Sequence, residues 1–229
     1  MVISMLELPI LTCQVEFDGY KLNLMTPGSA ESRFEFTGGK LCLDFANTVN
    51  NRTSDHPEEL LTDYPSLVKW GEEAGVLTPK NVERLHQLAG EALGHAQSAL
   101  RYAIQLRDAV YVLFVAVAGR RAVPGAALAM INAAVQQASE HARIVHSNRR
   151  FDWEWVLPDS SLDSVLWPVA RSAADLLTSD DLGHVRQCAA GDCGWLFLDK
   201  TKNHRRRWCD MKTCGNRDKA RRYYARKKA

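Results

Sequence analysis

The chain has 229 residues, of which 46% are hydrophobic and 24% are charged, the composition of a soluble globular protein with one large domain or two small ones. No apolar run reaches the roughly 18 residues that a membrane span requires, and the first residues lack the features of a secretion signal. These observations exclude the membrane and exported classes, and we expect a cytoplasmic protein without a membrane partner.

The net charge of +2 averages two regions of opposite sign. Residues 199–229 carry 13 Lys and Arg against 3 Asp and Glu, whereas the preceding 198 residues carry 16 against 24. A basic end on an acidic body predicts two parts with different partners. We therefore divide the chain into an N-terminal extension of loose order at 1–32, a body at 33–180 and a C-terminal module at 184–229.

The first elements predicted in chain order are strands. Residues 15–24 alternate weakly in polarity around Asp18-Gly19, which indicates a strand pair inside the extension. At 33–45, apolar residues alternate with polar ones on both sides of Gly38-Gly39, and this pattern predicts a β-hairpin.

Helices follow this hairpin. Apolar residues at helical spacing, with an N-cap signal at Thr78-Pro79 and a helix start at Pro124, predict a mostly helical run. The predicted helices cover 65–75, residues from 79 onward, 100–117, residues from 124 onward and 162–177. Residues 143–156 predict a second hairpin. The fold class is therefore predicted to be α+β, with a mostly helical body that carries β-hairpins.

Polar side chains gather just after the first predicted hairpin. Asp44, Asn47, Thr48 and Arg52 follow an apolar segment there, and a cluster of this kind is typical of the lining of a small-molecule pocket. The alternatives are turn and capping roles for Asn47 and Thr48 and an ion pair between Asp44 and Arg52.

Four of the six cysteines fall within 27 residues of the C-terminal module. They form two pairs, each with four intervening residues, and fifteen residues separate the pairs. Structural zinc is held by four thiolates in this manner, and a segment with few aliphatic residues needs such a staple. The predicted ligands of one structural zinc ion are Cys188, Cys193, Cys209 and Cys214. Four ordinary cysteines and disulfides are the alternatives.

His184 and His204 lie close enough in the sequence to compete as ligands. Four thiolates already complete a closed tetrahedral site, so we expect both histidines to lie outside it, and a closed site leaves no position for a catalytic water. No glycine-rich phosphate loop, metalloprotease motif or hydrolase motif occurs in the sequence. We therefore expect no enzymatic activity.

A basic loop at 200–207 joins the two cysteine pairs, and a basic helix is predicted at 210–229. The helix has too little apolar surface for a core element, although its tyrosines at 223–224 are suited to packing on Trp195 or Phe197. Its long cationic side chains are suited to phosphate binding, whereas a solvated basic tail is the alternative. The candidate nucleic-acid-binding residues are Lys200, Lys202, Arg205, Arg206, Arg207, Asn216, Arg217, Lys219, Arg221, Arg222 and Arg226.

Asn216 and Arg217 follow the last predicted zinc ligand, so the metal controls their geometry best. Because Arg pairs with guanine and Asn with adenine, both are candidates for reading base edges. The alternative for Asn216 is a cap at the start of the helix. The alternatives for Arg217 are a phosphate contact and an ion pair with Asp210.

The sequence resembles a known family in two places. The C-terminal module resembles the CGNR zinc finger, through Cys188-x4-Cys193-Gly-Trp-Leu-Phe-Leu-Asp, Arg206-Arg-Trp-Cys-Asp-Met and Cys214-Gly-Asn-Arg217. The body resembles the ABATE domain that usually precedes this finger, through Gly38-Gly39, Leu43-Asp-Phe-Ala-Asn-Thr48 and Arg52. The resemblance covers residues 33–225 and implies a bacterial, stress-induced transcription regulator that binds DNA through the finger and senses a ligand through the body.

The leading expectation is thus a DNA-binding transcription regulator, with a small-molecule effector and a homodimer as further expectations. A zinc-stabilised RNA-binding module is the main alternative, because basic loops and tyrosines also bind unpaired bases. A protein-interaction module whose basic end meets an acidic partner is the third class.

Overall fold

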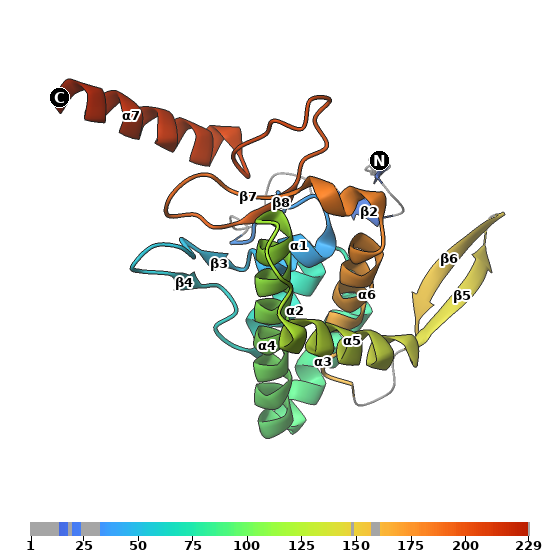
Figure 1. Ribbon diagram of the computed structural model, residues 1–229. Helices are drawn as coiled ribbons and strands as arrows, with labels where there is room; N and C mark the ends of the chain where they lie inside the picture. The colour runs from blue at the N-terminus through green and yellow to red at the C-terminus, as the bar shows by residue number, and fades with distance from the viewer. Residues whose placement is uncertain (1–13, 18–19, 24–32, 148, 157–160, 229) are drawn as a thin grey trace, which may run out of the picture. The chain divides into compact units, whose positions relative to one another are not determined.

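The computed structural model describes residues 14–17, 20–23, 33–147, 149–156 and 161–228 (Figure 1). The chain divides into two compact units, residues 1–32 and residues 33–229. In the first unit, strand β1 (Gln14–Phe17) pairs antiparallel with β2 (Tyr20–Asn23), which confirms the predicted strand pair. The prediction of loose order for the rest of this unit lies outside the described residues.

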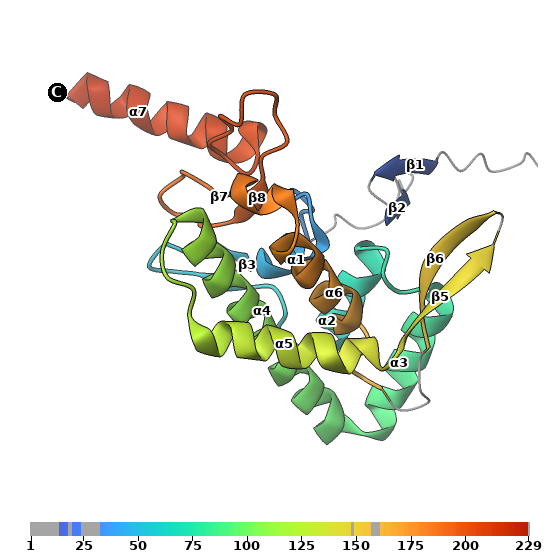
Figure 2. The ribbon, with the colours of Figure 1, turned by 45° about the vertical axis from the view of Figure 1, so that its right-hand side comes forward.

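Helices build the body of the second unit. They are α1 (Leu41–Ala46), α2 (Tyr64–Glu73), α3 (Pro79–Glu91), α4 (Leu93–Ala118), α5 (Gly125–Ser139) and α6 (Leu166–Leu177). Helix α4 is 26 residues long and contacts α1, α2, α3 and α5, while α5 also packs on α6 (Figure 2). The helices share one hydrophobic core, in which Trp70, Phe114 and Trp167 are buried. The predicted mostly helical body is confirmed.

Two of the helices begin at the caps that the sequence favours. The carboxylate of Asp63 accepts a hydrogen bond from the backbone N–H of Ser66 at 2.8 Å, and the Ser66 hydroxyl accepts one from the backbone N–H of Asp63 at 3.2 Å. Thr78 accepts a hydrogen bond from the backbone N–H of Asn81, with Pro79 at the first helical position. These caps satisfy N–H groups that have no partner inside the helix.

The strands of the second unit form two-stranded antiparallel sheets. Strand β3 (Val49–Asn50) pairs with β4 (Glu58–Glu59), β5 (Ala142–Ser147) with β6 (Arg150–Trp155), and β7 (Val185–Gln187) with β8 (Leu196–Leu198). The β5–β6 pair confirms the second predicted hairpin and extends away from the end of α5 (Figure 2). Among the described residues, no helix is both long and apolar enough to cross a membrane.

The hairpin predicted at 33–45 is wrong, because residues 41–46 form α1. Every residue from Cys42 to Ala46 is buried, in a helix that contacts α4, α6 and β8. A helix buried on all sides shows no helical period in its sequence, so the alternation of its apolar residues predicts a strand instead. Gly39, with φ of 76°, adopts the left-handed conformation just before the helix.

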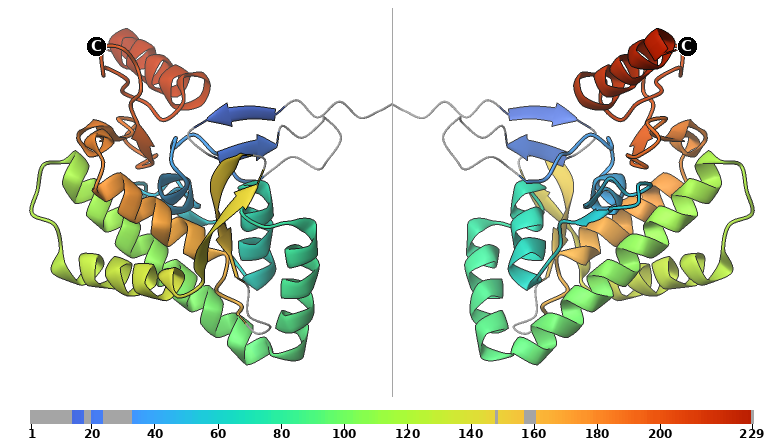
Figure 3. Two further views of the ribbon diagram at one scale, coloured as in Figure 1. Left: turned by 90° about the vertical axis from the view of Figure 1, so that its right-hand side faces the viewer. Right: turned by 90° about the vertical axis from the view of Figure 1, so that its left-hand side faces the viewer.

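The C-terminal part of the second unit is attached to the same core. Val185, Leu196 and Leu198 pack with the helices of the body. A π turn at Met211–Gly215 then leads into helix α7 (Asn216–Lys228), which stands clear of the body (Figures 1 and 3). The four-cysteine segment therefore lies between a firmly packed sheet and a projecting helix.

Candidate metal centre and nucleic-acid interface

The four predicted zinc ligands come together in the structure. The sulfur atoms of Cys188, Cys193, Cys209 and Cys214 all lie within 4.8 Å of one another, and all four residues are buried. The Sγ of Cys209 is 3.6 Å from that of Cys193 and 3.6 Å from that of Cys214. Thiolates bound tetrahedrally to zinc at about 2.3 Å lie about 3.8 Å apart. The cluster fits one structural zinc ion.

Local structure places each cysteine pair in a turn. The first knuckle, residues 188–195, joins β7 to β8 and is closed by a hydrogen bond of 2.7 Å from the backbone N–H of Cys188 to the carbonyl oxygen of Trp195. The second pair lies at the π turn, where Asp210 accepts a hydrogen bond of 2.8 Å from the backbone N–H of Thr213. Both turns are thus held by hydrogen bonds of their own.

Two donors offset the charge of the sulfurs. Four thiolates around Zn²⁺ leave two excess negative charges. The backbone N–H of Cys209 donates to the Sγ of Cys188 at 3.4 Å, and the guanidinium of Arg217 donates to the Sγ of Cys214 at 3.4 Å. Such outer contacts orient metal ligands and stabilise their deprotonated form.

The two histidines lie outside the four-sulfur cluster, as predicted. His184 and His204 stack on each other, with ring centroids 3.9 Å apart and an angle of 8° between the ring planes. The Nδ1 of His204 is 2.9 Å from the carbonyl oxygen of Asp199. The pair therefore links the basic loop to the segment ahead of β7.

Asp199 organises the basic loop at 200–207. This residue is buried, and its carboxylate accepts hydrogen bonds from the backbone N–H of Thr201 at 3.0 Å, from the Thr201 hydroxyl at 2.6 Å and from the backbone N–H of Arg206 at 2.9 Å. Burial opposes ionisation of this carboxyl, but the hydrogen bonds outweigh it and hold its pKa below the usual range.

The arginines of the loop divide into two kinds. Arg206 turns inward: it donates to the carbonyl oxygens of Trp208 and Cys209, and its guanidinium lies 4.4 Å from the ring centroid of Phe197. It therefore supports the second cysteine pair. The other cations predicted in the loop are exposed, namely Lys200, Lys202, Arg205 and Arg207.

The two residues predicted to read base edges both contact the finger itself. The side-chain amide of Asn216 donates to the carbonyl oxygen of Lys212 at 3.0 Å, a structural contact with the preceding turn that differs from the helix N-cap of the alternative. Arg217 forms its ion pair with Asp192, at 3.3 Å, and not with Asp210 as the alternative had it. Both residues are nevertheless exposed on one side.

Further along α7, two arginines form ion pairs within the molecule. Arg221 lies 3.4 Å from Asp192, and Arg222 lies 2.6 Å from Asp218 on the preceding turn. Lys219 and Arg226 are exposed. Asp192 thus gathers two cations of α7 at the first knuckle, next to the metal centre.

The expected packing of the two tyrosines on Trp195 or Phe197 is wrong. Tyr223 is 55% exposed and Tyr224 64% exposed, and their rings meet edge to face with centroids 5.6 Å apart. Helix α7 has already left the finger at this point (Figure 3). The two rings are therefore available on the same element as the cations.

Two members of the predicted ligand pocket are buried with protein partners. Asp44 accepts a hydrogen bond of 2.7 Å from the backbone N–H of Gly38, and burial raises its pKa to about 7. The hydroxyl of Thr48 donates to the carbonyl oxygen of Phe45 at 2.9 Å. The Thr48 contact is the turn or capping role that the sequence left open for that residue, whereas the alternative left open for Asp44 was an ion pair with Arg52.

The other two members of that set bind the finger and α4 instead. Asn47 donates to the carbonyl oxygen of Leu196 and accepts from its backbone N–H, both at 2.8 Å. Arg52 pairs with Asp108 at 2.5 Å, and not with Asp44. Two surface pockets, of about 440 and 310 Å³, lie elsewhere, one along α3 and one between α4 and α5.

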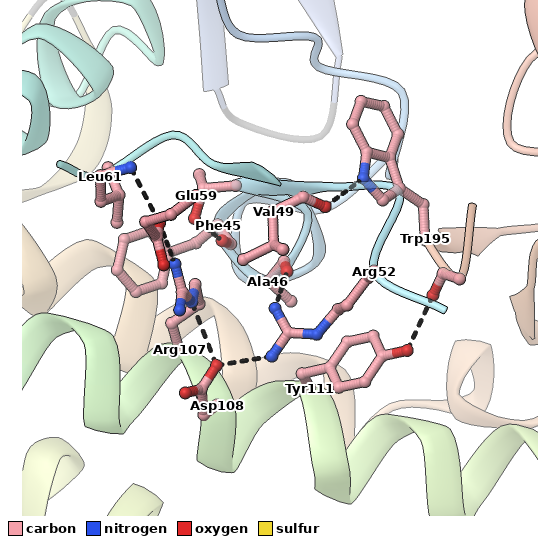
Figure 4. A network of polar contacts seen from close by, with 12 residues as sticks. Phe45, Ala46, Val49, Arg52, Glu59, Leu61, Arg107, Asp108, Tyr111 and Trp195 are labelled. Atoms are coloured by element: carbon pink, nitrogen blue, oxygen red, sulfur yellow. Dashed lines mark hydrogen bonds and ion pairs between the residues drawn. The ribbon is translucent and has the colours of Figure 1, made fainter. Parts of the chain in front are cut away.

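A chain of charged side chains runs from the body to the first knuckle (Figure 4). Arg107 is only 3% exposed and bonds both Glu59, at 2.5 Å, and Asp108, at 3.2 Å. Asp108 in turn holds Arg52, whose guanidinium lies 3.8 Å from the ring centroid of Tyr111. The hydroxyl of Tyr111 donates to the carbonyl oxygen of Gly194 at 3.1 Å.

Three residues of this site are not among those predicted from the sequence. Tyr111 lies among the apolar positions of a long helix, where only its contacts distinguish it. Asp192 and Asp199 are acidic residues inside a basic module. That sign reversal was the one available hint that they bind the neighbouring cations and N–H groups.

Comparison with known families gives two matches. A model named ABATE and described as "Putative stress-induced transcription regulator" matches residues 39–180, and a model of the CGNR zinc finger matches residues 184–227. No curated protein matches the chain.

Proposed function

The chain belongs to the ABATE family, whose model is described as "Putative stress-induced transcription regulator", and it carries a CGNR zinc finger; we propose that this finger binds duplex DNA. The proposal follows from the arrangement of charge around the metal centre. An exposed basic loop and a projecting basic helix both extend from the metal-held finger, so the spacing of their cations is fixed. The finger is proposed to act as a regulator's DNA-binding element, without enzymatic activity.

Helix α7 is the single observation that carries this proposal. It contains seven Lys and Arg against one Asp, and residues 219–227 are exposed along its whole length. Such a helix buries no apolar face that would explain its formation. Its attachment to a metal-held turn and its long cationic side chains suit binding to a polyanion with regularly spaced phosphates.

The contacts within the finger suggest different roles for its cations. Lys202, Arg205 and Arg207 extend from the loop that Asp199 holds in place, and we assign them to phosphates. Lys219 and Arg226 extend that surface along α7. Arg206 is left out of the set, because its guanidinium is occupied by carbonyl oxygens of the finger.

RNA is the second candidate, and one observation favours it. Tyr223 and Tyr224 are exposed beside the cations, and exposed aromatic rings stack on unpaired bases. A duplex-DNA reader does not need these rings. Substitution of both tyrosines by Ala therefore separates the two: it weakens RNA binding only.

A small-molecule effector and a homodimer remain predictions. The contacts of Asp44, Asn47, Thr48 and Arg52 with the protein itself direct the search for an effector away from them. The length of DNA protected from nuclease digestion tests the dimer, since a two-fold pair covers two half-sites about one helical turn apart.

Titration of the full-length protein with labelled duplex DNA, and with RNA of the same sequence, tests the proposal. We expect tighter binding to the duplex, a steep loss of affinity with salt, and loss of binding when a chelator removes the zinc. Substitution of Lys202, Arg205 and Arg207 by Ala should lower the salt slope by about 3. The matched control replaces three cations of the body, Lys69, Arg143 and Arg171, and should leave the slope unchanged.

A further inference from the structure

The two family matches meet at residues 180–184, yet several hydrogen bonds join the parts of the chain on either side of this boundary. They join the segments on both sides of α1, together with α4, to the first knuckle and β8. The donors and acceptors on the body side are Gly38, Asn47, Val49, Arg52, Thr53 and Tyr111.

Three of these bonds hold the backbone of the first knuckle around the ligand Cys193. The backbone N–H of Arg52 donates to the carbonyl oxygen of Cys193 at 3.1 Å. The Tyr111 hydroxyl donates to the carbonyl oxygen of Gly194 at 3.1 Å, and the Thr53 hydroxyl donates to that of Gly191 at 3.1 Å. The body thus fixes the peptide groups on both sides of a zinc ligand.

The knuckle is also pressed closely against the body. Gly194 has φ of 71°, and a Cβ added there would lie 2.7 Å from the Cγ2 of Thr53 and 3.1 Å from the Tyr111 hydroxyl. Only glycine permits this backbone conformation and this approach. On the far side, Asn47 holds both backbone groups of Leu196.

The residues that hold the knuckle are themselves fixed. Arg52 is clamped between the Asp108 carboxylate and the Tyr111 ring, and Arg107 orients Asp108 from a buried position (Figure 4). A metal site binds more tightly when its ligands are ordered before the ion arrives, because binding then restricts less of the chain. The body supplies that order for Cys193.

We infer that Arg52 and Tyr111 are positioning residues of the zinc centre, so that the body determines how tightly the finger retains its metal. Tyr111 acts through the hydrogen bond from its hydroxyl to the carbonyl oxygen of Gly194. The Arg52 side chain acts indirectly, because it anchors the loop whose backbone N–H donates to Cys193. A disturbance of the Arg107–Asp108–Arg52 chain then reaches the zinc site. This inference concerns metal retention and does not depend on DNA binding.

The test measures zinc affinity of the full-length protein by competition with a chromogenic chelator. Tyr111→Phe removes only the hydroxyl, and we expect a several-fold weaker affinity. Arg52→Ala also loosens the loop that supplies the backbone donor to Cys193, and we expect a loss of ten-fold or more, within the range seen for outer-shell residues of metal sites. Co²⁺-loaded variants should show an altered ligand-field spectrum, which reports the geometry of the four sulfurs.

Matched controls come from the same protein. Tyr102→Phe removes a hydroxyl from α4 that bonds Gln137, and Arg171→Ala removes an arginine that pairs with Asp175 and covers Trp153. Both should keep the zinc affinity and the Co²⁺ spectrum of the parent. If Arg52→Ala and Tyr111→Phe match these controls in both measurements, the inference is overturned, even where they lower the thermal unfolding temperature. Normal zinc retention with absent DNA binding would reject only the proposed function.

Discussion

Arg217 donates a hydrogen bond of 3.4 Å to the Sγ of Cys214, three residues before it on the same turn. The same guanidinium lies 3.3 Å from Asp192 of the first knuckle. One side chain therefore joins the last zinc ligand to the opposite cysteine pair, at the point where α7 begins. This position makes it a support of the metal centre as well as a candidate for DNA contact.

Arg217→Ala is therefore expected to weaken zinc affinity about ten-fold and to lower DNA affinity equally on every sequence. The reason is that the substitution removes the cation that offsets the thiolate charge and loosens the start of α7. Arg226→Ala, on the same helix, is the control and should lower DNA affinity without affecting zinc. Chelator competition and DNA titration check both results. A loss of affinity confined to one base position would instead show base reading by Arg217.

Asp192→Asn should tighten DNA binding several-fold. Asp192 pairs with Arg217 and Arg221, and its negative charge also repels approaching phosphates. Removing that charge frees Arg221 for the DNA and releases one of the two contacts of Arg217. Asp175→Asn makes the same charge change on α6 and should leave the affinity unchanged. Titrations at two salt concentrations measure the effect, and weaker binding by Asp192→Asn would mean that the ion pairs are needed to hold α7 in place.

The zinc ligands and the basic character of the finger could be predicted because they are local. Two cysteine pairs with short, fixed spacing indicate a four-sulfur metal site without any information about the body. The start of helix α3 could also be predicted, because Thr78 and Pro79 mark it to within one turn. Features of this kind depend only on residues that are close in the sequence, so the sequence pattern predicts them.

The hydrogen bonds between the body and the finger could not be predicted in the same way. Asn47 meets Leu196 across 149 positions of the chain, and no spacing rule relates such residues. From the sequence alone, Asn47 is equally consistent with a turn residue and with a residue that lines a ligand pocket. Arg206 shows the same limit within the finger, because a basic run does not reveal which of its members turns inward.

Zinc removal is expected to unfold the finger while the helices of the body persist. The small cluster around Trp195 and Phe197 includes the four cysteines, so it loses its centre when the metal leaves. Circular dichroism should show loss of α7 and the thermal transition should shift downward. The body keeps its own core, which includes Trp70 and Trp167. Cys209→Ser should reproduce the effect of the chelator, whereas Cys42→Ser, at a buried cysteine outside the cluster, should not release zinc.

Asp44 should make the protein less stable as the pH rises. Burial raises its pKa to about 7, against an unfolded value of about 3.9, although the Gly38 N–H opposes the shift. Because the folded state binds the proton more tightly, the stability that protonation provides is complete below pH 4 and disappears as the pH approaches 7. Between pH 6 and pH 8 the expected loss is about 1 kcal/mol.

Asp44→Asn removes this dependence, since an amide is neutral throughout and still accepts the hydrogen bond from Gly38. We expect the variant to exceed the parent in thermal unfolding temperature by several degrees at pH 8 and by less at pH 6. Both measurements are made with zinc in excess, so that metal release does not contribute to the difference. Asp175→Asn, at an exposed carboxylate, should show no such trend. An equal gain at both pH values would mean that Asp44 is already ionised in the folded protein at pH 6.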